Sequence, residues 1–70
     1  MAMITLSPGE RFEHYHSDVS RTQHVSGSVE IVTPDGVRRL ATGESVELEA
    51  NTRHILINVG EVPATVACWH

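Results

Sequence analysis

The chain has 70 residues, one cysteine and a formal net charge of −4 at pH 7. This length allows one domain, residues 1–70, which buries only about 60% of the surface that its unfolded form exposes. A single cysteine excludes an internal disulfide, so we expect a metal or oligomerisation to add stability. The acidic charge argues against nucleic acid as a partner. All five cationic residues are arginines, which excludes a lysine base or Schiff base within this chain.

The apolar pattern of the sequence also indicates where in the cell the protein is located. No charged-then-apolar stretch at the N-terminus is typical of a signal peptide, and no apolar run is long enough to span a membrane. The lone thiol of Cys68 gives no sign of an extracellular disulfide scaffold. We therefore expect a cytoplasmic protein without a membrane partner.

The first predicted strands lie in residues 3–6 and 11–16. The apolar run 3–6 ends at the turn signal Ser7-Pro8-Gly9. Residues 11–16 alternate with the two-residue period of a strand. One face of that strand carries Phe12, His14 and His16.

The middle of the chain continues as strands and turns. Residues 17–20 are polar and predict a loop, and a strand follows over 22–26. Gly27 marks a turn or a bulge. Residues 28–33 are rich in β-branched side chains, and Pro34-Asp35-Gly36 is a strong hairpin signal.

The last third completes an all-β pattern. Val46 and Leu48 alternate with glutamates, which predicts a half-buried strand. Further strands are predicted at residues 37–41, 54–59 and 64–69. Seven or eight short strands at regular spacing predict a sandwich or a barrel.

Three histidines suggest a metal site. In a strand, His14 and His16 have the same orientation, with origins about 7 Å apart. A third imidazole, from His54 on a distant strand, would complete a facial set and leave positions open for water or substrate. Neutral imidazoles suit the divalent transition metals Zn, Fe, Ni, Mn and Cu. The predicted ligands are therefore His14, His16 and His54.

Two motifs surround these histidines. The first contains Gly9, His14-Tyr15-His16, Ser20 and Gly27, and the second contains Gly43, Glu49, Asn51, His54 and Asn58. In this spacing the chain resembles the cupins from about residue 7 to residue 69. The resemblance implies a small jelly-roll β-barrel of seven or eight short antiparallel strands with a metal inside. Glu49 and Asn51 stand where the family usually has Pro and Gly.

The position of the family's fourth ligand differs in this chain. Cupins usually have a glutamate where this sequence has Ser20, and serine is a poor ligand for these ions. The fourth position could be open or filled by water, as in the three-histidine thiol dioxygenase branch of the family. It could instead be filled by His24, which shares strand parity with Ser20, or by Gln23 if the register slips by one. The open position is preferred.

The scaffold has a closer likeness within the family. Residues 8–10, 25–28 and 58–63 resemble the C-terminal cupin of bacterial mannose-6-phosphate isomerase/mannose-1-phosphate guanylyltransferase. That group usually has Gln at the position of His14. A sugar phosphate also needs a cationic anchor, and the strand parity of Arg11 and Arg53 predicts that both point out of the barrel. The likeness therefore supports the fold more than the activity.

Three classes of function follow. The first is a metal-binding cupin that acts on or binds a small molecule, with dioxygenase or isomerase-like chemistry possible. The second is a non-catalytic cupin that senses or binds a small ligand or a sugar. The third is a structural domain with idle histidines, and the sequence does not decide whether the protein is an enzyme. Because small barrels have exposed edges, we also expect a homodimer, with residues 1–6 and 64–69 as contact elements.

Overall fold

A computed structural model describes residues 2–15 and 17–69, with the side chain of His14 outside the description. Within these residues the chain forms eight strands and no helix. The strands are β1 (Ala2–Leu6), β2 (Arg11–Tyr15), β3 (Ser20–Ser26), β4 (Val29–Thr33), β5 (Gly36–Leu40), β6 (Ser45–Leu48), β7 (Arg53–Asn58) and β8 (Ala64–Trp69). The predicted all-β fold of seven or eight short strands is confirmed.

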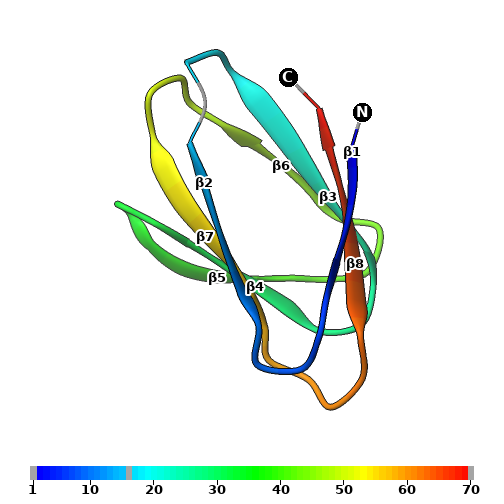
Figure 1. The fold of residues 1–70 in the computed structure, drawn as a ribbon. Helices are drawn as coiled ribbons and strands as arrows, with labels where there is room; N and C mark the ends of the chain where they lie inside the picture. The colour runs from blue at the N-terminus through cyan, green and yellow to red at the C-terminus, as the bar shows by residue number, and fades with distance from the viewer. Residues whose placement is uncertain (1, 16, 70) are drawn as a thin grey trace.

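The strands form two four-stranded antiparallel sheets, ordered β1-β8-β3-β6 and β2-β7-β4-β5 (Figure 1). Consecutive strands alternate between the sheets, except for the β4–β5 hairpin, which stays within one. The chain therefore winds around a shared interior, as in a jelly roll. The edge strands, each with a neighbour on one side only, are β1 and β6 in one sheet and β2 and β5 in the other.

The core lies between the two sheets. Every second residue of a strand points inward, which gives β7 its alternation of buried and half-buried residues. The buried hydrophobic cluster consists of Leu6, Val29, Ile31, Leu40, Leu48, Leu56, Ala64, Val66 and Cys68. Burial of each large aliphatic side chain contributes about 1.5–3 kcal/mol. The predicted inward orientation of Val46 and Leu48 is confirmed, since Leu48 is buried and Val46 packs against the core.

Several predicted strand boundaries differ from the structure by one residue, and the largest difference is at the start of β3. β3 begins at Ser20, whereas the polar composition of residues 17–20 predicted a loop. Ser20 and Arg21 are in strand conformation because they pair with Leu48 and Glu47 of β6. This long-range pairing overrides the local preference of polar residues for a loop.

Gly27 connects β3 to β4 at a crowded position. The predicted turn at Gly27 lies in this connection, and the pairing of β3 with β8 shifts register before it, between His24 and Ser26. Gly27 has φ +84°, and a Cβ atom there would lie 2.6 Å from the Cβ of Ala64. Glycine is therefore required both by the backbone conformation and by the close approach of β8.

Asn51 explains how the second motif works without its usual glycine. Its φ is 59°, in the left-handed region that favours glycine. Asparagine tolerates this conformation better than most other residues. Its Oδ1 atom also accepts a hydrogen bond from the Tyr15 hydroxyl at 3.3 Å. Asn51 can therefore replace the glycine in the turn before β7.

Candidate functional site

The register of β2 and β7 places two of the predicted ligands opposite each other. His14 and His54 are directly paired in this antiparallel ladder. The Cα atoms of such partners lie about 4.5–5.5 Å apart, and partners occupy the same face of the sheet. His54 is on the inner face, with only 1% of its surface exposed. The pairing therefore brings the two histidine positions together at the barrel interior.

The ring of His54 is positioned by the turn that precedes β7. Its Nδ1 atom lies 3.4 Å from the carbonyl oxygen of Thr52. A proton on Nδ1, donated to this carbonyl, leaves Nε2 with the lone pair. Metal-binding histidines are commonly oriented in this way by a backbone carbonyl. His54 therefore suits the role of a nitrogen ligand.

The remaining predicted ligands are described only in part. The backbone of His14 belongs to β2, but its side chain and the whole of His16 lie outside the described residues. Among the described residues, no group of three His, Cys, Asp or Glu side chains could hold a metal ion. The three-histidine set therefore stays a prediction that the His14–His54 register supports.

Ser20, at the position of the family's carboxylate, faces the interior. It pairs with Leu48 of β6 and is 4% exposed. Its buried hydroxyl has no hydrogen-bond partner among the residues that the structure describes. A buried hydroxyl without a partner carries a desolvation cost of about 1–3 kcal/mol, and a water or a ligand atom would remove that cost.

The two alternatives for the fourth ligand occupy different places. His24 is buried on the inner face, and neither ring nitrogen has a hydrogen-bond partner in the described part of the chain. It lies four residues along β3 from Ser20, about 13 Å at 3.3 Å per residue. Gln23 has the opposite parity, and its amide donates to the Gly43 carbonyl at 3.1 Å. Neither side chain lies at the position of Ser20.

Cys68 belongs to the hydrophobic core. Its Sγ atom lies 3.7 Å from the Thr22 hydroxyl, in a buried contact. Burial raises the pKa of the Cys68 thiol, and the contact with Thr22 opposes this only in part. A neutral buried thiol is a poor nucleophile.

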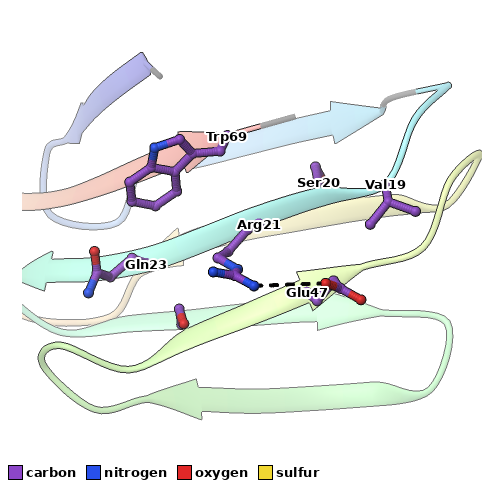
Figure 2. A pocket seen from close by; sticks show the side chains of 7 residues that line it. Val19, Ser20, Arg21, Gln23, Glu47 and Trp69 are labelled. Atoms are coloured by element: carbon purple, nitrogen blue, oxygen red, sulfur yellow. Dashed lines mark ion pairs between the residues drawn. The ribbon is translucent and has the colours of Figure 1, made fainter.

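A hollow of about 570 Å³ lies over the sheet of β8, β3 and β6 (Figure 2). Outward-facing Arg21, Gln23, Glu47 and Trp69 line it, and Arg21 lies 4.0 Å from Glu47 in an exposed ion pair. No histidine of the described residues lines this hollow. It is therefore separate from the position of His54.

A smaller pocket, of about 320 Å³, opens between the β4–β5 hairpin and β6, and we name it the β5–β6 pocket. Its apolar lining comes from core-facing Ile31, Val46 and Leu48. Thr52, whose carbonyl approaches His54, lines it as well. Thr52 is thus the residue that this pocket shares with the surroundings of His54.

One charged side chain of this pocket was not anticipated as a site residue. Arg38 pairs with Ile31 in the β4–β5 ladder, so it takes the inner-face position. Its Nη2 atom lies 2.6 Å from Oε2 of Glu44. The Ala41 amide and Arg38 hold the pKa of Glu44 below its ordinary value. The hairpin signal at residues 34–36 fixes this register, so the parity of Arg38 could have been read from the sequence.

Comparison with known proteins agrees with this fold. The family model Cupin_2, described as a cupin domain, matches residues 2–70. No curated protein sequence matches the chain.

Solved structures show the same fold. The Cupin_2 domain of an XRE family transcriptional regulator from Enterobacter cloacae has a TM-score of 0.84 and 20% identity, covering 94% of this chain and 73% of that one. A de novo designed double-stranded β-helix has a TM-score of 0.83 and 25% identity, with coverage of 96% and 92%. A cupin superfamily sugar phosphate isomerase from Silicibacter pomeroyi has a TM-score of 0.80 and 22% identity, with coverage of 94% and 45%. This chain therefore spans less than half of that isomerase.

Proposed function

We propose that this chain, which belongs to the Cupin_2 family of cupin domains, binds a divalent transition metal and a small molecule inside its barrel. Cupins commonly bind metals or small molecules. The proposed metal ligands are His14, His16 and His54. The observation that carries the proposal is the direct pairing of His14 with buried His54 across β2 and β7.

The donor set narrows the kind of ion. Three neutral imidazoles suit Zn, Fe, Ni, Mn or Cu and do not suit Mg or Ca, which prefer oxygen ligands. A bound ion of this kind would supply Lewis acidity, or oxygen activation in the case of iron. The chain's own contribution is to orient His54 by the Thr52 carbonyl and to keep His54 buried from bulk water.

Ser20 favours an open fourth position. Its hydroxyl faces the interior but is a poor ligand, so water or the small molecule would take the place of the family's glutamate. Serine also cannot act as the carboxylate acid or base that a glutamate offers at this position. This favours, as the alternative function, a cupin that binds or senses a small ligand without chemistry.

The likeness to sugar-phosphate enzymes gives a weaker proposal. One structural neighbour is a sugar phosphate isomerase, and the scaffold resembles the mannose-6-phosphate isomerase cupin. Arg53 lies on the exposed face and pairs with Glu13 at 3.1 Å, and Arg11 is exposed as well. Neither arginine is available as an interior phosphate anchor, so sugar binding rests on the scaffold alone.

We also propose that the protein is a homodimer. β1 is an edge strand with Met3 55% exposed, which suits pairing with a second copy. β8 lies between β1 and β3, so it would contribute side chains of its outer face and no free edge. A mass measurement that finds only monomer at micromolar concentration would contradict this.

No helix in the described residues is long and apolar enough to cross a membrane. A cytoplasmic location stays a prediction.

Metal uptake tests the proposed function. Purified protein is dialysed against Zn, Ni, Mn or Fe(II), and bound metal is measured by elemental analysis. We expect about one ion per chain in the wild type and a loss of uptake in His14→Ala and His54→Ala. His70→Ala, at the last residue, is the matched histidine control and should keep the ion. Failure of the wild type to take up any of these metals would overturn the proposal. Turnover of a small molecule by the metal-loaded protein would distinguish an enzyme from a sensor.

A further inference from the structure

The β5–β6 pocket has the dimensions and lining of a small-molecule site. Its volume of about 320 Å³ falls at the lower end of the range for small ligands. Ile31, Val46 and Leu48 give it an apolar floor formed by both sheets. It lies where the edge strands β5 and β6 face each other without pairing, so the opening is built into the topology.

Arg38 is the charged residue at an inward strand position of this pocket, and its side chain, 53% exposed, lies at the opening. Its ladder partner Ile31 is 1% exposed, which fixes the inner face at this register. Arg39 has the opposite parity and pairs with Glu30 at 3.1 Å on the outer face. The two adjacent arginines of β5 thus have different surroundings.

The guanidinium of Arg38 is held in place but retains free donors. Glu44 contacts its Nη2 atom at 2.6 Å, and the Glu44 carboxylate is itself fixed by the Ala41 amide at 3.1 Å. A guanidinium has five N–H donors in a planar fork, and this contact engages only one nitrogen. The remaining donors have the geometry that binds a carboxylate or a phosphate.

We propose that Arg38 binds the anionic group of a small molecule whose apolar part lies against Ile31, Val46 and Leu48. The anionic group is a carboxylate or a phosphate. This inference rests on the proposed function, because the molecule that Arg38 binds is the same small molecule that reaches His54.

The acidic residues at the opening of the pocket restrict the class of ligand further. Asp35, Glu47 and Glu49 line the opening, and none occupies an inward strand position like that of Arg38. Asp35 is in the hairpin turn, and Glu47 pairs with Arg21 in the ladder of the outer-facing residues. These carboxylates repel additional negative charge. The ligand class is therefore a molecule with one anionic group and an uncharged apolar body.

Matched probes test this assignment in metal-free protein. Isotope-labelled protein is titrated with 3-methylbutanoate and with 3-methylbutyl phosphate, and 3-methylbutan-1-ol serves as the uncharged control. We expect saturable shifts of the Arg38 Nε–Hε signal and of the Ile31 and Leu48 amides, with a dissociation constant on the order of millimolar. Arg38→Gln should weaken binding about tenfold, whereas Arg39→Gln should leave it unchanged.

The outcomes are distinct. Saturation by the acid alone or by the phosphate alone supports the proposal and identifies the anion. Equal binding to Arg38→Gln, binding of the alcohol as tight as that of the acid, or no saturable binding of either anion would overturn it. Retained amide dispersion shows that Arg38→Gln still folds. Because no metal is added, anion binding at Arg38 is measured independently of metal binding at the histidines. Failure of either experiment therefore leaves the result of the other unchanged.

Discussion

His14 of β2 and His54 of β7 are direct partners in an antiparallel ladder, although they lie far apart in the sequence. A pair of this kind has a fixed separation that loop movements do not change, because the ladder hydrogen bonds on both sides define it. His54 is buried on the inner face of its sheet. The proposed metal site depends on this relationship.

Asn58, the last polar residue of the second motif, is expected to be structural. Its buried amide donates to the carbonyls of Leu6 at 2.9 Å and Val62 at 2.8 Å, and it accepts from the Gly60 amide at 2.9 Å. Asn58→Ala leaves these groups without partners, so urea denaturation should show a loss of about 3 kcal/mol in the free energy of unfolding. Asn51→Gly is the control and should change it by less than about 1 kcal/mol, since glycine adopts the same φ. Equal losses would contradict the assignment.

Gly27 and Gly9 form a matched pair for the crowding at β8. Both have positive φ, but a Cβ atom at Gly27 would lie 2.6 Å from Ala64, whereas one at Gly9 would have no atom within 4 Å. Gly9→Ala should cost about 1–2 kcal/mol from the backbone conformation alone. Gly27→Ala should cost at least about 2 kcal/mol more, because the methyl group clashes with β8. Thermal unfolding of both variants checks this, and similar melting temperatures would count against it.

The lowered pKa of Glu44 predicts that the stability of the fold depends on pH. Its pKa is lowered in the folded protein from an ordinary value of about 4.5, first by the Ala41 amide and then by Arg38. The stabilisation is therefore fully present above the unfolded value and is lost as the pH falls through the lower folded value. The effect is small, since the ion pair is solvent-exposed. Melting temperatures of wild type and Glu44→Gln should differ at about pH 6 and converge toward about pH 3; a gap that widens in acid would refute this.

Most of the fold could be predicted because its signals are local. The alternation in residues 11–15, the hairpin at Pro34-Asp35 and the glycine at residue 27 each specify one element, and the structure has all three. The start of β3 at Ser20 could not be predicted, because β6 determines it through pairing across the sheet. Strand boundaries of this kind depend on partners that the local sequence does not contain.

The site could be predicted in part. The two-residue period of the strand and the spacing of the second motif indicated the histidines, and the register of His14 with His54 agrees with that prediction. Arg38 was not recognised, because its role depends on the gap between β5 and β6, which follows from the order of strands in two sheets. The position of His24 in the barrel likewise could not be predicted, because it depends on the pairing of β3 with β8, where His24 is the partner of Val66.

The most direct test of the central claim is the position of a bound metal. Crystals grown with Zn²⁺ are measured at the zinc absorption edge, and an anomalous difference map locates the ion. We predict one peak per chain, about 2.0–2.1 Å from a nitrogen of each of His14, His16 and His54. An anomalous peak at another group of side chains, or no peak between these three histidines in zinc-loaded crystals, would contradict it.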